Sequence, residues 1–357
     1  MEEKIMKNRV SGETRAKVGS FLIRFAIGVV ISFGIFSIFL ATQKQNPLDV
    51  YRALLTGFTT SRYNVGEIWV KMTPILIAGM AALIPAKVGL CNCGGEGQLI
   101  AGALVANITG VFICPTWPAY LGIPFMMIMA AIGGAVWGAI PLFCKMKLNM
   151  NETLTTLLMN YIMTRLVAYL VFGPIKDTNG NNYPMSARIP DQLRMPCFQG
   201  SRANFTIFIA IALAVLVWFF MNKTEIGFKM QAIGGNERAA QFAGYKVRKI
   251  QILSFLIAAG LSGLAGGFVM SSVEFQMREA TASGLGFMGF LATGIVGDNP
   301  LLAIPSSFML AALSASGTTL ELSTGLRAAA STIFMSVILL TIFALGKRLT
   351  IKSQDSK

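Results

Sequence analysis

The residues of this chain that could do chemistry gather in two glycine-rich stretches. One runs from Asn92 to Gln98 and contains the acidic residue Glu96, and the other runs from Ser283 to Gly289. Gly284-x-Gly286-x-x-Gly289 matches a dinucleotide fingerprint by letter, but that fingerprint requires a strand before it and a helix after it in a soluble βαβ unit. No strand is predicted on either flank. Close helix packing or a broken helix is the better interpretation.

The sequence does not predict an enzyme. It contains no histidine and no Walker A pattern, so no hydrolytic constellation and no phosphate-cradling loop is evident. The odd number of scattered cysteines argues against a disulfide framework, and Cys91-x-Cys93 is too tightly spaced for a usual zinc site. We expect no bound metal or cofactor, and we expect these thiols to be small apolar fillers in helices: Cys91, Cys93, Cys114, Cys144 and Cys197.

Composition points to a membrane protein. Of the 357 residues, 54% are hydrophobic and 13% are charged, and the mean hydropathy is +0.63. Soluble domains carry about 25% charged residues, so this chain could not cover an ordinary water-facing surface. The net charge of +14 does not indicate nucleic-acid binding, because the basic residues lie between apolar segments rather than on one solvated face.

About 20 apolar residues span a bilayer core. On that measure we predict an all-α polytopic protein of about ten transmembrane helices, which together form a permease domain at 21–346. The helices are centred on 21–41, 67–86, 96–113, 119–142, 153–173, 204–222, 250–272, 283–297, 300–315 and 328–346. The segments near 67–113 and 273–315 are interrupted by glycine and proline. Gly134-x-x-x-Gly138 and Gly263-x-x-x-Gly267 are predicted to be helix-packing motifs.

The distribution of basic residues predicts the orientation. With ten helices and both termini in the cytoplasm, the inner segments hold 18 of the 30 Lys and Arg residues and the outer loops hold 9. This bias follows the positive-inside rule. The N-terminal segment 1–20, the loop 223–249 and the tail 347–357 are then cytoplasmic, and 42–66 and 174–203 are outer loops. An inverted repeat is suggested because Gly97, Leu99 and Gly102 align with Gly289, Leu291 and Gly294, although chance recurrence in a glycine-rich chain is the alternative.

The loop 223–249 holds the most informative polar stretch. Asn236 is a good N-cap, Glu237 places a carboxylate at the positive end of a helix, and Gly244 suits the position just after a helix. The prediction is a single short helix that another protein could enclose. A solvated connector helix is the alternative.

Polar residues recur on the segment that begins near 153. Thr153, Thr156, Asn160 and Thr164 are spaced by three and four residues, which places them on one helix face. They could line a solute path, or they could form hydrogen bonds between helices, which is the favoured alternative. Glu96 opens another predicted helix, where the dipole stabilises its charge.

Four stretches resemble permeases of the ribose and branched-chain amino-acid superfamily of ABC importers: Ala86–Gln98, Asn151–Ile162, Ala232–Gly244 and Gly286–Pro300. Within that superfamily they are most similar to nucleoside and simple-sugar permeases. Cys91 and Cys93 depart from the family pattern, which has Phe and Ile there. At Gly235 and Glu237–Arg238 the third stretch also differs from the residues that are usual in the family.

The resemblance implies a multi-pass permease subunit of the cell membrane that imports nucleosides, or simple sugars, by alternating access. It implies a cytoplasmic ATP-binding subunit that hydrolyses ATP with Mg²⁺, a second permease subunit of a different sequence, and an extracellular solute-binding lipoprotein. Coupling to the ATPase is assigned to Ala232, Gly234, Asn236, Glu237, Ala239, Ala240 and Gly244. The translocation path is assigned to Asn92, Gly94, Gly95, Glu96, Gly97, Gln98, Thr156 and Asn160. An ion-coupled secondary transporter is the alternative function, but it would need buried coupling residues that are scarce here.

Overall fold

The computed structural model describes residues 27–59, 62–178, 183–281, 284–297, 299–326 and 329–354. Within these ranges the regular structure is helical, and extended pairing is limited to three isolated bridges in loops. Six described helices are long and apolar enough to cross a bilayer, and a bent pair, Ile27–Thr42 with Pro47–Thr56, would make a seventh. The prediction of an all-α polytopic membrane protein is confirmed.

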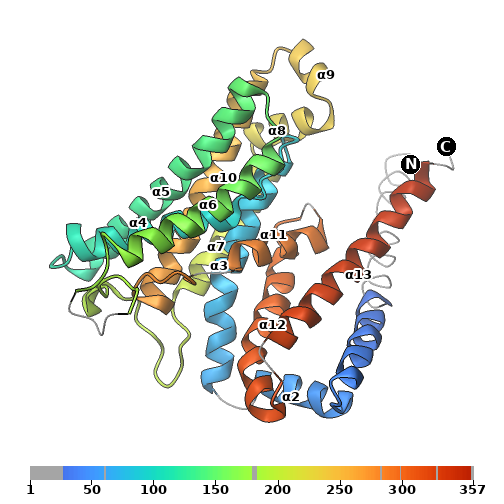
Figure 1. Ribbon diagram of the computed structural model, residues 1–357. Coiled ribbons are helices and arrows are strands. Elements are labelled where there is room, and N and C mark those ends of the chain that lie inside the picture. The colour runs from blue at the N-terminus through green and yellow to red at the C-terminus, as the bar shows by residue number, and fades with distance from the viewer. Residues whose placement is uncertain are drawn as a thin grey trace, which may run out of the picture. The chain divides into compact units, whose positions relative to one another are not determined.

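After the helix Ile27–Thr42, the elements follow in chain order, and Figure 1 labels the α-helices among them. They are α2 (Pro47–Thr59), α3 (Arg62–Ala86), α4 (Gly95–Ile108), η1 (Thr109–Ile113), α5 (Ala119–Leu148), α6 (Glu152–Phe172), η2 (Asp191–Leu193), α7 (Thr206–Lys223), α8 (Glu225–Gly235), α9 (Glu237–Phe242), α10 (Val247–Val269), η3 (Met270–Glu274), α11 (Leu285–Val296), α12 (Ala303–Thr324) and α13 (Ala329–Gln354).

Each of the ten predicted membrane segments coincides with a described helix, but some boundaries move. α3 begins at Arg62 rather than near residue 67, and α5 continues to Leu148 rather than ending near 142. α11 has only 12 residues. At 1.5 Å per residue it covers about 18 Å, which is too short for a hydrocarbon core of about 30 Å. α11 is therefore shorter than a full membrane span.

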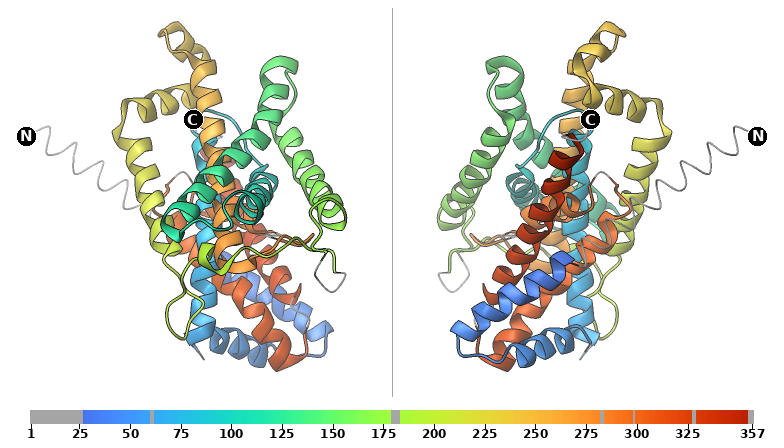
Figure 2. Two further views of the ribbon diagram at one scale, coloured as in Figure 1. Left: turned by 90° about the vertical axis from the view of Figure 1, so that its left-hand side faces the viewer. Right: turned by 90° about the vertical axis from the view of Figure 1, so that its right-hand side faces the viewer.

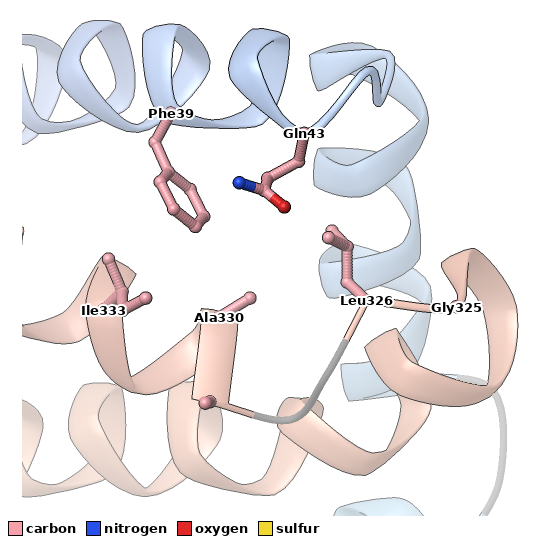
Figure 3. A pocket seen from close by; sticks show the side chains of 7 residues that line it. Phe39, Gln43, Gly325, Leu326, Ala330 and Ile333 are labelled. Atoms are coloured by element: carbon pink, nitrogen blue, oxygen red, sulfur yellow. The ribbon is translucent and has the colours of Figure 1, made fainter.

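The chain divides into two compact units, one formed by 59–312 and the other by 1–58 with 313–357. In the second unit, aromatic rings pack together, with 4.5 Å between the centroids of Phe36 and Phe334. That unit also contains a cavity of about 420 Å³ (Figure 3), lined by Phe39, Gln43, Gly325, Leu326, Ala329, Ala330 and Ile333. No predicted site residue lines this cavity, so the candidate site belongs to the unit 59–312.

The core of the unit 59–312 is built from α3, α4, α5 and α10, and glycines let these helices pack backbone to backbone. A Cβ atom added at Gly134 of α5 would lie 2.5 Å from the carbonyl oxygen of Ala259, and one at Gly263 of α10 would lie 2.4 Å from that of Ala130. Small residues allow membrane helices to approach this closely. Both predicted packing motifs are confirmed as contacts between α5 and α10.

Replacing Gly266 with alanine should destabilise the protein strongly, because an added Cβ would lie 1.9 Å from the carbonyl oxygen of Leu99 on α4. Overpacking of this kind costs about 1–3 kcal/mol or more, since backbone cannot move as a side chain can. The matched control is Gly260→Ala on the same helix, where the nearest atom would be 3.5 Å away. We expect a lower midpoint of thermal unfolding in detergent for Gly266→Ala only. Equal midpoints for the two variants would contradict the described packing of α4 on α10.

α8 and α9 lie at one end of the unit 59–312, and the loop that precedes α7 lies at the opposite end (Figures 1 and 2). We call the former the α9 end. Several parts of the predicted organisation lie outside the described residues: the N-terminal segment 1–20 and the first residues of the predicted helix 21–41, the loop residues 179–182, residues 283 and 328 at the beginning of two predicted helices, and the final residues 355–357.

Candidate functional site: a helix junction and a capped helix

The first part of the site is the loop 87–94, which links α3 to α4. Gly89 has a φ of +77°, so the chain turns there in a conformation that favours glycine. Further along, the amide oxygen of Asn92 accepts a hydrogen bond from the backbone N–H of Gly94 at 3.0 Å. The Asn92 and Gln98 side-chain amides also bond to each other in both directions, at 2.9 and 3.1 Å. This amide pair holds the loop against the first turn of α4.

Glu96 joins the beginnings of two helices that are far apart in the sequence. Its carboxylate accepts hydrogen bonds from the backbone N–H groups of Gly284 at 2.5 Å, Gly286 at 2.7 Å and Phe287 at 3.3 Å. These groups lie at the N-terminus of α11, where the N–H groups have no partner within the helix and the dipole favours an anion. Glu96 therefore caps α11 as well as lying in the first turn of α4.

A glycine at 286 is required for this contact. A Cβ atom added there would lie 2.5 Å from both N and Cα of Glu96. The dinucleotide-like glycine pattern thus serves a close approach of two helix ends, as predicted. We call the meeting point of α4 and α11 at Glu96 the helix junction.

Asn160 on α6 ties a third helix to the junction. Its side-chain oxygen accepts from the N–H of Gly97 at 2.8 Å, and its Nδ2 donates to the carbonyl oxygen of Cys93 at 2.9 Å. The alternative of interhelical hydrogen bonding is therefore realised at this position. Thr156 lies one turn earlier, 3.0 Å from where a Cβ of Gly94 would be, and its hydroxyl bonds to its own helix.

The structure brings together the eight residues predicted near the translocation path. Their polar side chains are buried, with exposures of 5% for Glu96, 3% for Asn160 and 0% for Thr156. In this conformation they bond mainly to one another and to helix ends. Contact with solute remains a prediction.

The second part of the site is the α9 segment. Asn236 is the N-cap of α9, and its side-chain oxygen accepts from the N–H of Ala239 at 3.0 Å. At the other end, Gly244 has a φ of +82°, and its N–H donates to the carbonyl of Gln241 at 3.0 Å. The N–H of Tyr245 donates to the carbonyl of Ala240 at 3.1 Å, which completes a Schellman motif. Both predicted caps are confirmed.

The prediction of a single short helix in 223–249 is wrong. A separate helix, α8, precedes α9, because Thr224 caps it by accepting from the N–H of Gly227 at 3.1 Å. Ala232 and Gly234, assigned to the coupling helix from the sequence, lie on α8 instead. Asn236, Glu237, Ala239 and Gly244 are exposed on or beside α9, whereas Ala240 is buried.

Sequence reasoning missed Phe242, the last residue of α9, which is 94% exposed. This phenylalanine is held outward on a capped helix at the α9 end, in a polar loop. The signal available in the sequence was an aromatic residue in an otherwise Ala-rich helix.

α8, which leads directly into α9, touches the first part of the site. Gly234 lies so close to the loop 87–94 that an added Cβ would be 2.4 Å from the carbonyl oxygen of Lys87. Gln251 on α10 also donates to the carbonyl of Val88 at 3.5 Å. A displacement of α8 and α9 would therefore press directly on the loop that leads to the helix junction.

Of the five cysteines predicted to fill space inside helices, only Cys144 lies in one. Cys91 and Cys93 are half-buried in the loop 87–94, Cys114 is buried just after η1, and Cys197 is exposed in a loop. All five are free thiols.

Replacing Gly244 with valine should unwind the end of α9, because a β-branched residue is strained at a φ of +82°. No atom lies within 4 Å of an added Cβ, so the effect would come from the backbone alone, at roughly 1–2 kcal/mol or more. Gly244→Asn should be tolerated, since asparagine adopts this conformation, and Gly235→Ala is the control at an ordinary φ. Faster amide hydrogen exchange across 237–245 in Gly244→Val alone is the expected result. Unchanged amide exchange across 237–245 in Gly244→Val would show that Gly244 does not stabilise the end of α9.

Comparison with known proteins supports the resemblance stated above. The family model described as "Branched-chain amino acid transport system / permease component" matches residues 64–346. A glucose ABC transporter permease protein of Haloferax volcanii is 29% identical, over 87% of this chain and 84% of its own length. A guanosine ABC transporter permease protein of Bacillus subtilis is 28% identical over 92% and 97%. A nucleoside ABC transporter permease protein of Lactococcus lactis is 27% identical over 77% and 78%.

The family match covers the helix junction, the α9 segment and the apolar helices from α3 onward. The chain therefore belongs to the family of branched-chain amino acid transport system permease components, and it is a membrane-spanning permease subunit of an ABC importer.

Proposed function

We propose that this permease moves nucleosides, or less readily simple sugars, into the cell by alternating access driven by a partner ATPase. The observation that carries the proposal is a continuous series of contacts. α9 packs on α8, Gly234 of α8 contacts Lys87, and the loop 87–94 leads from there to the helix junction. An ATPase that binds α9 could transmit its own conformational change along this route of contacts. The named relatives transport guanosine, other nucleosides and glucose, which supports the substrate class.

The helix junction is suited to a gate. Three helices, α4, α6 and α11, meet there through hydrogen bonds between buried groups, so a movement of one helix away from the others would break part of this network. α11 is a half-span whose N-terminus lies inside the protein, which is typical of helices that border a transport path. We infer that the residues of the junction change their contacts as the path opens.

The proposed assembly contains two permease subunits of different sequence, with the solute passing between them. ATP and Mg²⁺ are hydrolysed by a cytoplasmic ATP-binding subunit that docks on α9, and a solute-binding lipoprotein delivers the solute from outside. The α9 end then faces the cytoplasm, and both termini lie on that side of the cell membrane, in agreement with the bias of Lys and Arg toward it.

An ion-coupled carrier would need a buried acidic residue free to exchange a proton. Glu96 is the one buried charged residue in the described part of the chain, and its carboxylate is held by three backbone N–H groups. Such an arrangement favours a permanent helix cap over a proton relay.

The decisive experiment reconstitutes the chain in lipid vesicles with its partner permease, ATPase and binding lipoprotein. ATP hydrolysis is measured with guanosine, glucose and leucine as test solutes. We expect guanosine to stimulate hydrolysis most. Stimulation by leucine but not by guanosine or glucose would overturn the substrate class, and uptake that persists without ATP would overturn the importer function.

A further inference from the structure

The loop 87–94 carries two thiols in contact with each other. The Sγ atoms of Cys91 and Cys93 are 3.6 Å apart, and both side chains are half-buried. The loop lies between the ends of α3 and α4, outside both spans. Cys91 also lies beside the hydroxyl of Thr153 and near the carboxylate of Glu152, which pairs with Lys145 at 2.8 Å.

The two thiols differ in acidity. A hydrogen bond from the Cys93 thiol and another from the Thr153 hydroxyl lower the pKa of Cys91 to about 6, against the opposing effects of burial and of Glu152. The same bond to Cys91, together with burial, raises the pKa of Cys93. A thiolate is the nucleophile in thiol–disulfide exchange, and a second thiol in contact can resolve the product.

We propose that Cys91 and Cys93 form a thiol modification site that a low-molecular-weight disulfide oxidises to an intramolecular disulfide. The Cys91 thiolate attacks one sulfur of the reagent RS–SR, so that a Cys91–S–SR mixed disulfide forms and RS⁻ leaves. Cys93 then loses its proton, and its sulfur attacks Cys91, which displaces the second RS⁻. The protein dithiol is oxidised, and one RS–SR is reduced to two RSH.

The loop that would carry this bond also holds the start of α4. Cys93 accepts the hydrogen bond from Asn160 through its carbonyl oxygen, and Asn92, between the two cysteines, pairs with Gln98. We therefore expect the disulfide to alter the backbone at the helix junction and to loosen the bond between Asn160 and Gly97.

The test uses the whole chain purified with its partner subunits and incubated with oxidised glutathione at pH 6. The Cys93 thiol and the Thr153 hydroxyl lower the pKa of Cys91 and so favour its thiolate, and Cys91 should therefore be the first thiol to react. Peptide mapping by mass should find a Cys91–Cys93 disulfide that a reducing agent reverses. The Cys93→Ser variant should stop at a glutathione adduct on Cys91, and Cys91→Ser should leave Cys93 unmodified.

Cys144→Ser is the matched control and should behave as the unaltered protein. A pair that stays reduced, or a glutathione adduct that accumulates without closing, would overturn the assignment of this site. The second readout is amide hydrogen exchange of the peptide 94–98, which should increase on oxidation of the unaltered protein but not of Cys93→Ser. Unchanged exchange in an oxidised sample would overturn the link to the helix junction. Neither readout involves the transported solute, so failure here is distinct from failure of the proposed function.

Discussion

Replacing Glu96 with alanine should reduce solute uptake by more than about tenfold and destabilise the protein by roughly 2–4 kcal/mol. The carboxylate is the hydrogen-bond acceptor for three N–H groups at the start of α11, two of them at 2.5 and 2.7 Å. Without it, buried donors would lack a partner, and each such donor costs about 1–3 kcal/mol. The N-terminus of α11 would also lose the charge that its dipole favours. Uptake into vesicles and the thermal unfolding midpoint in detergent measure the two effects.

Two variants make this prediction specific. Glu96→Gln keeps one carbonyl oxygen for the N–H groups of α11, so an intermediate loss is expected. Glu279→Ala removes a carboxylate that is 47% exposed and pairs with an exposed Arg165, and it should change little, because exposed ion pairs contribute about 0–1 kcal/mol. If Glu96→Ala retained normal stability and uptake, the helix junction would have no role in the fold or in transport.

Replacing Phe242 with alanine should weaken docking of the ATPase by about 30-fold or more while leaving the membrane fold intact. The side chain is 94% exposed in this chain alone, so its removal breaks few contacts within the protein. A central aromatic residue in an interface is worth at least about 2 kcal/mol, which corresponds to roughly 30-fold in the dissociation constant. The measurement is the affinity of the purified ATPase for the permease in detergent.

The control for Phe242 is Phe219 on α7, which is 56% exposed but belongs to an apolar span. Phe219→Ala should leave ATPase affinity unchanged, and Phe242→Trp should largely preserve it, because a large ring still fills the partner's surface. If Phe242→Ala bound the ATPase with normal affinity, or if Phe219→Ala lost as much affinity, α9 would not be the docking element. Thermal midpoints should be the same for all three variants.

Local features of the α9 segment were predictable because their causes lie within a few residues. An N-cap needs an acceptor such as Asn236 two or three residues before the N–H groups that it satisfies, and a Schellman motif needs a residue such as Gly244 that tolerates a positive φ. The beginning of α8 was missed although its cap, Thr224, is equally local. The apolar segment was predicted to end at 222, and 223–249 was predicted to be a loop with one short helix, so a helix directly after Thr224 was not expected.

The helix junction was predictable only as a set of residues. The stretches around Glu96 and Gly286 were recognised because glycines and an acidic residue are conspicuous in an apolar chain. That the carboxylate of Glu96 reaches N–H groups 188 to 191 residues further along the chain could not be read from either stretch. Such a bond depends on how α4 and α11 pack, and no local propensity encodes that packing.

The sequence by itself determined that this chain lies in a membrane, where its apolar segments run, and how α9 is capped, because hydrophobic burial and capping depend on composition and on neighbouring residues. Only the tertiary structure decided that α11 is a half-span capped by Glu96, that Gly234 presses on the loop at Lys87, that Phe242 points away from the protein, and that Cys91 and Cys93 share one loop surface near Thr153. The contacts of Glu96, of Gly234 and of Cys91 with Thr153 join segments whose approach is set by helix packing, and the exposure of Phe242 depends on the same packing, which is a property of the whole chain.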